Sequence, residues 1–103
     1  MNNRFNGMLG LAAKSGAAVS GEFSVEQALK KGLAYLVILA EDASENTKKH
    51  FNDMCSYRNV PVIFYSDKQG LGKYTGKQSR ASVAILDKGF ADRLISIIRE
   101  GLI

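Results

Sequence analysis

SGEFSVEQALKKGLAYLVILAEDA, residues 20–43, contains the two patterns that decide the fold class. The second pattern, residues 36–40, is a continuous apolar run without alternation, which is typical of a strand covered on both faces. Gly32 lies between this run and the first pattern, residues 20–31, and can end a helix in the left-handed conformation. The first pattern predicts a helix between Ser20 and Lys31, with apolar side chains at helical spacing: Val25, Ala28 and Leu29.

The start of that predicted helix can be read in two ways. Ser24 and Gln27 have the spacing of a capping box, in which a hydroxyl and an amide side chain cap the backbone N–H groups reciprocally. Ser20 could instead serve as the cap four residues earlier. Both readings stay open from the sequence.

Helical and extended patterns continue to alternate on both sides of this stretch. An extended piece is expected at residues 17–20, and buried strands are expected at 62–65 and 83–86. Strands covered on both faces and separated by helices predict an α/β fold, a three-layer α/β/α sandwich. Four other helices are expected. The first has Phe5, Met8, Leu9 and Ala12 on its inner side, and the last has Phe90, Ala91, Leu94, Ile95 and Ile98 there. Between them, a third helix is capped by Ser44 with Phe51 and Cys55 on one side, and a short helix covers residues 69–75.

Length and composition limit the class of protein. A chain of 103 residues suits one domain, residues 1–103. One cysteine cannot form an internal disulfide or a multi-cysteine zinc site, so a reducing cytoplasm is the expected compartment. No apolar run approaches the roughly 20 residues of a membrane span, and the first residues do not have the pattern of a signal peptide.

Positive charge is concentrated in two separate stretches. The formal net charge is +4, from 14 basic and 10 acidic side chains. Residues 1–32 hold four basic and two acidic side chains, and residues 67–82 hold four basic and one acidic. A fold that brings these stretches together would form one basic face suited to polyanions. A solvated surface with modest charge is the alternative.

The glycine-rich segment 70–77, GLGKYTGK, follows a predicted strand but fits no nucleotide motif. Gly72 and Gly76 are one residue too close for a P-loop, and Gln78 stands where the P-loop has Ser or Thr. Thr75 stands where a dinucleotide-binding segment needs its last glycine. Glycines that permit close packing of a helix against a strand are the favoured interpretation.

Four other residues have side chains that could take part in chemistry. Glu41 and Asp42 follow a buried strand and could act as acid and base, but capping the third helix is favoured. His50 is the only histidine and lacks metal-ligand spacing to any other His or Cys, so a solvated position is expected. Cys55 lies on an apolar helix side and is expected to be an inert small hydrophobe.

Several segments agree in order and spacing with one known family. Nearly the whole chain resembles the L7Ae/L30e superfamily of kink-turn RNA-binding ribosomal proteins. Its opening LGLAA and closing LDKGFA resemble most closely the bacterial YlxQ-type branch. The segments that carry the resemblance are residues 20–43, NVPV at 59–62, LGKYTG at 71–76 and SVAI at 82–85.

The resemblance implies a mixed sheet of about four strands and RNA binding without catalysis, cofactor or metal. In the family, the start of the second helix reads Gly-Thr-Asn-Glu-x-x-Lys and enters the RNA groove at sheared G·A pairs beside a bulge. The other family contact is the loop before the last strand. The matching positions here are Gly21, Glu22, Phe23, Ser24 and Gln27, then Lys31 at the helix end, and Lys77, Gln78 and Arg80 in the loop.

Two departures from the family pattern change the expected specificity. Asn and Glu of the family hydrogen-bond purine edges, and each good base contact contributes roughly 1–3 kcal/mol of discrimination. Phe23 cannot form such a bond, and Ser24 reaches less far than Glu. Phe23 could stack on an unpaired base or be buried against the second helix, and burial is favoured.

The sequence therefore predicts a monomeric RNA-binding protein for kink-turn or related structured RNA, such as rRNA, with ribosome association as one expectation. A protein-interaction module on the same fold is the alternative, because the Asn and Glu positions have changed. A small nucleotide-binding enzyme is suggested only by the glycines of residues 70–77.

Overall fold

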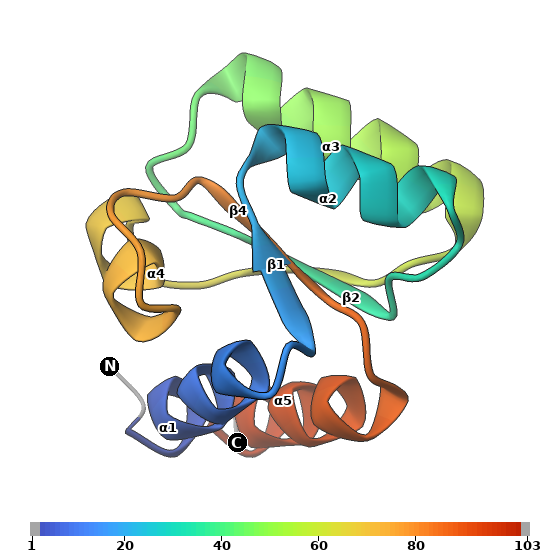
Figure 1. Cartoon of the computed structure of the whole chain (residues 1–103). Helices are drawn as coiled ribbons and strands as arrows, with labels where there is room; N and C mark the ends of the chain where they lie inside the picture. The colour runs from blue at the N-terminus through green and yellow to red at the C-terminus, as the bar shows by residue number, and fades with distance from the viewer. Residues whose placement is uncertain (1–2, 102–103) are drawn as a thin grey trace.

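The computed structural model describes residues 3–101, in which helices and strands alternate (Figure 1). No helix within these residues is both long and apolar enough to cross a membrane. The elements are α1 (Asn3–Lys14), β1 (Ala18–Ser20), α2 (Glu22–Lys30), β2 (Leu36–Leu39), α3 (Glu45–Arg58), β3 (Val62–Phe64), α4 (Lys68–Tyr74), β4 (Ser82–Ile85) and α5 (Lys88–Gly101).

The strands form one four-stranded sheet across the described part of the chain, in the order β1-β4-β2-β3. β2 and β3 are parallel, whereas β4 is antiparallel to both β1 and β2. The register sets Val37 of β2 opposite both Val62 of β3 and Ala84 of β4. The sheet is therefore mixed, as the family resemblance implied.

Helices cover both faces of this sheet, with α2 and α3 above it and α1 and α5 below it in Figure 1. Side chains of a strand point alternately to the two faces. Leu36 and Ile38 accordingly belong to the core between the sheet and helices α1 and α5, whereas Val37 and Leu39 belong to the core between the sheet and helices α2 and α3. All four are fully buried, which explains the unbroken apolar run and confirms the three-layer sandwich.

β3 corrects one expectation, because it is not a fully buried strand. It pairs only with β2 and forms an edge of the sheet, so its residues are half-buried or exposed. Phe64 is 45% exposed, and the Lys48 ammonium lies 5.9 Å from its ring centre. An apolar run does not reveal whether its strand will have one neighbour or two.

The helix boundaries follow from specific residues. The Ser44 hydroxyl accepts a hydrogen bond from the Thr47 amide at 3.1 Å, which confirms the predicted cap of α3. α3 ends at Asn59 in the left-handed conformation, with φ 57°. In α5, Ile97 is buried although the sequence reading missed it, while Phe90, Ile95 and Ile98 are only partly buried.

Asp42 does not cap α3, contrary to expectation. Its carboxylate accepts a hydrogen bond from the Lys68 amide at 2.8 Å, so it stabilises the first turn of α4. The Asp67 carboxylate caps the same helix by accepting from the Gly70 amide at 2.7 Å. The chain reversal after β2 places Asp42 beside an element 26 positions later, which sequence proximity could not indicate.

Cys55 is buried in the core between the sheet and the α2–α3 layer. Burial disfavours the thiolate and raises the pKa of this thiol from 9.0 to about 11, although the nearby Arg58 charge opposes the shift. The thiol is therefore a packing group rather than a nucleophile, as expected.

Candidate nucleic-acid interface

The start of α2 has no side-chain cap. Gly21 occupies the N-cap position with φ 94°, a conformation that side chains rarely adopt. Neither Ser20 nor Ser24 caps the helix, so both readings of the helix start are wrong. The Gly21 amide donates to the Ser82 carbonyl at 3.0 Å, which fixes the start of α2 beside β4.

The outer side of α2 carries the side chains that the sequence reading selected. Val25, Ala28 and Leu29 are buried, and this orients the intervening positions outward. Phe23 is 74% exposed, so the expectation that it would be buried against α2 is wrong. An exposed ring beside a helix start is available for contact with a partner.

The second segment of the site is the basic loop, defined as residues 75–81. It is fixed against α4 by backbone hydrogen bonds, from the Lys77 amide to the Gly72 carbonyl at 2.7 Å and from the Arg80 amide to the Lys68 carbonyl at 2.9 Å. Gly72 is essential to this contact, because a Cβ there would overlap the Gln78 carbonyl. The glycines of α4 thus serve close packing, but against the basic loop at Gln78 and against Ser66 before the helix, rather than against a strand as expected.

The structure places α2 and the basic loop side by side (Figure 1). The Arg80 guanidinium Nε donates to the Ser20 hydroxyl at 3.1 Å, across 60 positions of sequence. The same side chain lies 3.9 Å from the point where a Cβ on Gly21 would stand. The two basic stretches of the sequence therefore meet at the start of α2.

Shallow depressions run along this junction. One of about 370 Å³ contains Ser20, Ser24, Lys77 and Arg80 in its lining. A second of about 330 Å³ shares Ser24 and the neighbouring β1 strand with it and continues along α2 to Phe23, Gln27 and Lys31. We call this continuous surface the α2–loop surface; it includes the predicted positions Gly21, Phe23, Ser24, Gln27, Lys31, Lys77 and Arg80.

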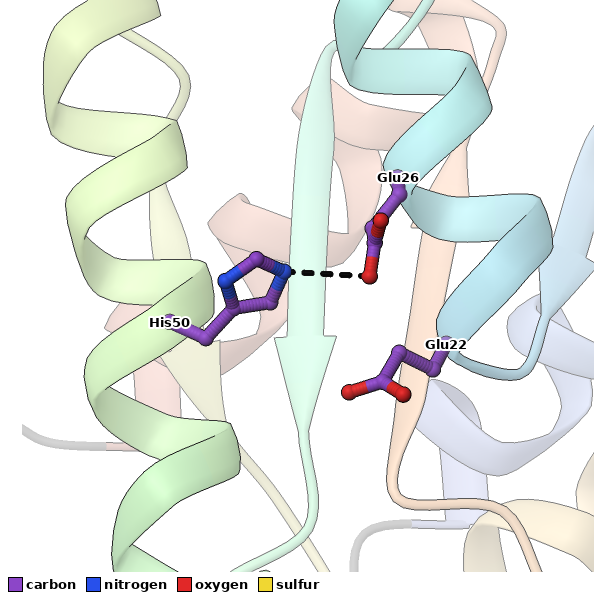
Figure 2. A group of neighbouring side chains, drawn as sticks. All are labelled: Glu22, Glu26 and His50. Atoms are coloured by element: carbon purple, nitrogen blue, oxygen red, sulfur yellow. Dashed lines mark hydrogen bonds and ion pairs between the residues drawn. The ribbon is translucent and has the colours of Figure 1, made fainter.

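Two predicted positions lie at the margins of the α2–loop surface. Gln78 lines a separate depression beside α4 together with Lys77. Glu22 turns away from the basic loop and toward α3 (Figure 2). The lining also includes Val19, Ser20, Leu33 and Leu86, which the sequence did not indicate. The first three lie within two positions of a predicted residue, whereas Leu86 reaches the depression only through the fold.

Charge on the α2–loop surface is positive and uncompensated. Within residues 3–101, the ion pairs of the structure involve other basic side chains, and Lys31, Lys77 and Arg80 form none. Lys31 and Lys77 are exposed, and Arg80 is half-buried. The Arg80 guanidinium donates to the Ser20 hydroxyl and, at 2.9 Å, to the Ser79 carbonyl, but both acceptors are neutral. The charges of all three side chains can therefore neutralise phosphates of a ligand.

Glu22, Glu26 and His50 form a cluster between α2 and α3 (Figure 2). His50 Nε2 lies 3.1 Å from Glu26 Oε1, so the histidine is paired rather than merely solvated. One ligand atom of each side chain lies within 4.8 Å of the others, and such atoms can coordinate a divalent cation. Exposed acidic groups of this kind commonly occur without an ion. Spacing along one helix could not reveal this cluster, because His50 comes from a second helix.

Comparison with known proteins agrees with this architecture. The RNA-binding protein YlxQ of Bacillus subtilis is 43% identical over 91 residues, which cover 88% of this chain and 91% of that protein. The RNA-binding protein YlxQ of Enterococcus faecium is 34% identical over 91 residues, covering 88% and 87%. Both matches extend over most of each chain.

Solved structures show the same fold. A Bacillus halodurans C protein of unknown function superposes with a TM-score of 0.90 at 35% identity, covering 95% of this chain and 99% of that one. A Giardia lamblia 15.5kD RNA binding protein superposes with a TM-score of 0.76 at 20% identity, covering 97% and 89%. Residues 3–95 match the family model described as ribosomal protein L7Ae/L30e/S12e/Gadd45. The chain belongs to this family.

Proposed function

We propose that this chain is a non-catalytic RNA-binding protein that binds structured RNA of the kink-turn type on the α2–loop surface. The observation that carries the proposal is the junction of the two basic stretches at Gly21, where Arg80 bonds to Ser20. Family membership and the RNA-binding names of the YlxQ relatives support it.

Each part of the α2–loop surface has a distinct role in this proposal. Gly21 lacks a side chain and leaves the first turn of α2 uncapped, so a phosphate can approach its backbone N–H groups. Lys31, Lys77 and Arg80 neutralise phosphates, which supply most of the affinity and make it salt-dependent. These contacts position the RNA without reading its sequence.

Recognition of bases falls to the remaining side chains. The exposed Phe23 ring stacks on an unpaired base, a contact that every base can provide. Ser24, Gln27 and Gln78 can donate or accept hydrogen bonds, whereas the Glu22 carboxylate can only accept and therefore suits amino groups of bases. Specificity then depends on RNA shape and one unstacked base more than on paired purine edges.

Two finer proposals accompany this function. The RNA is rRNA or another ribosome-associated RNA, which is supported by the ribosomal name of the family. The protein acts as a monomer in a reducing compartment such as the cytoplasm, which suits its single buried thiol.

A protein-interaction module is the second candidate, favoured by the apolar side chains beside α2. Phe23 and Leu33 are 74% and 49% exposed and line one depression. An exposed apolar patch often marks a protein interface. Partners captured from a lysate by the wild-type chain that survive nuclease treatment, and are lost in Phe23→Ala, would favour this candidate.

The test of the proposed function compares two RNAs by calorimetry at 50 and 200 mM salt. One RNA carries a kink-turn, and the control has its sheared G·A pairs replaced by Watson–Crick pairs. Clear preference for the kink-turn at both salt concentrations is expected. Equal, salt-sensitive binding would contradict kink-turn recognition, and absence of binding to either RNA would overturn the RNA proposal.

A further inference from the structure

A third depression, of about 770 Å³, lies beside α4 on the far side of the basic loop. Lys68 and Lys73 of α4 and Lys77 of the loop line it, opposite a single carboxylate, Asp42. Lys73 also lines an adjoining depression of about 230 Å³ that contains Lys14 at the end of α1. We call these two depressions the α4 groove.

The lysines of the α4 groove outnumber its one lining carboxylate, Asp42, and within the described part of the chain none of them is held in an ion pair. Across residues 3–101, Lys14, Lys68, Lys73 and Lys77 take part in none of the ion pairs of the structure. The Asp42 carboxylate accepts a hydrogen bond from the Lys68 amide at 2.8 Å, and its single negative charge leaves the groove with a net positive charge. Like charges held close together in such excess attract an anion from solution.

The framework of the α4 groove is fixed by hydrogen bonds to backbone carbonyls of α4, not by the lysine side chains. The Thr75 hydroxyl donates to the Leu71 carbonyl at 2.8 Å, and the Lys77 amide donates to the Gly72 carbonyl at 2.7 Å. These contacts fix the chain between α4 and the loop, while the lysine side chains remain exposed. Replacing a lysine side chain therefore changes charge and leaves the framework intact.

The α4 groove adjoins the α2–loop surface at Lys77. Lys77 lines both the 770 Å³ depression and the 370 Å³ depression that contains Ser24 and Arg80. An extended polyanion that occupies one surface would thus pass directly onto the other. A small anion would need only one of them.

We propose that the α4 groove is a second phosphate-binding surface, which takes the sugar–phosphate backbone of an RNA strand continuing from the segment on the α2–loop surface. The inference rests on the proposed function for the identity of the polyanion. Its contacts come from lysine side chains, because the first-turn amides of Lys68 and Gly70 in α4 already bond to Asp42 and Asp67. The groove contributes affinity and orientation but no base specificity.

The test is the salt dependence of RNA binding by a Lys68→Gln/Lys73→Gln double variant. Each lost phosphate contact lowers the slope of log K against log salt by about one. The double variant should therefore lose about two from the wild-type slope. Because salt rises fourfold between 50 and 200 mM, the wild type would lose about 16-fold more affinity than the variant.

The matched control is a Lys49→Gln/Lys88→Gln double variant, which removes two exposed lysines from α3 and α5. Both control lysines lie in exposed ion pairs, with Asp53 and Asp92, and the net charge changes by the same amount. The control should keep the wild-type slope. Thermal unfolding of all three proteins verifies that the folded state is retained.

The outcomes separate this inference from the proposed function. Preference for the kink-turn tests recognition by the α2–loop surface. The difference in salt slope tests phosphate contacts in the α4 groove, and any structured RNA that the chain binds can be used for it. An unchanged slope in the Lys68→Gln/Lys73→Gln variant, or an equal reduction in the control, would overturn the inference. Saturable binding of inorganic phosphate or of a polyglutamate peptide that is lost in the variant, with the RNA slope unchanged, would assign the groove to those ligands and overturn it as well.

Discussion

The α2 part of the α2–loop surface is supported by a buried helix side, whereas the basic loop is supported by its own backbone hydrogen bonds. Val25 and Leu29 anchor α2 in the core, and its outer side chains can change without disturbing that anchor. The loop depends on close backbone approach at Gly72. One half should therefore tolerate side-chain substitution, and the other should be sensitive to backbone crowding.

Gly72→Ala should produce the largest effect, on the loop half. The added Cβ would overlap the Gln78 carbonyl, which is backbone and cannot rotate away. Overpacking of this kind costs about 1–3 kcal/mol of unfolding free energy, measurable by chemical denaturation. Gly7→Ala in α1 is the control, because its Cβ meets open space and should stabilise by about 0.5–1 kcal/mol. Equal stability of Gly72→Ala and wild type would contradict the loop's dependence on this contact.

Phe23→Ala should separate binding from stability in the α2 half. The ring is 74% exposed, so unfolding free energy should change by less than about 0.5 kcal/mol. Loss of base stacking should weaken RNA binding by about 1–3 kcal/mol without changing its salt slope. Tyr57→Ala, at an aromatic 84% exposed on α3, should leave RNA affinity unchanged. Unchanged affinity in Phe23→Ala would remove stacking from the account.

Arg80→Gln should have the opposite signature, in the loop half. Loss of one phosphate contact should lower the slope of log K against log salt by about one and should weaken the binding of all RNAs to a similar extent. Calorimetry across a salt series measures both quantities, and Arg93→Gln on α5 provides the charge-matched control. A slope equal to that of the wild type would show that Arg80 does not contact a phosphate and that its role is the hydrogen bond to Ser20.

The smallest expected effect concerns the reactivity of the Cys55 thiol, which reports how stably α2 and α3 pack on the sheet. With its pKa near 11, the thiol should resist alkylating reagents at pH 8 until denaturant exposes it. The folded-state pKa exceeds the ordinary value of 9.0, so the associated stability is complete below about pH 9 and is lost as pH rises through 11. Rapid labelling of the native protein at pH 8 would show that the α2–α3 layer opens readily.

The sequence predicted most accurately what depends on local pattern. The run in β2 predicted a strand covered on both faces, and the Ser44 cap was confirmed by a 3.1 Å hydrogen bond. The charge distribution pointed to two stretches, and the fold joins them through Arg80 and Ser20. Local spacing and charge count were sufficient for these features.

The errors lie where tertiary neighbours decide. Burial was predicted wrongly for the edge strand β3 and for the exposed Phe23, because a short apolar pattern does not reveal how many elements will cover it. Asp42 caps α4 rather than α3, since its partner lies 26 positions away. His50 joins Glu22 and Glu26 only through the packing of two helices. Each of these features requires knowledge of which elements are adjacent.

The most direct test of the central claim, that α2 and the basic loop form one RNA surface, is an NMR titration of the isotope-labelled protein with kink-turn RNA. Amide signals of residues 21–27 and 77–81 should shift together, with a common dissociation constant. Signals of α3 and α5, which carry none of the α2–loop surface, should remain in place. Shifts confined to one half, or centred on α5, would contradict the account.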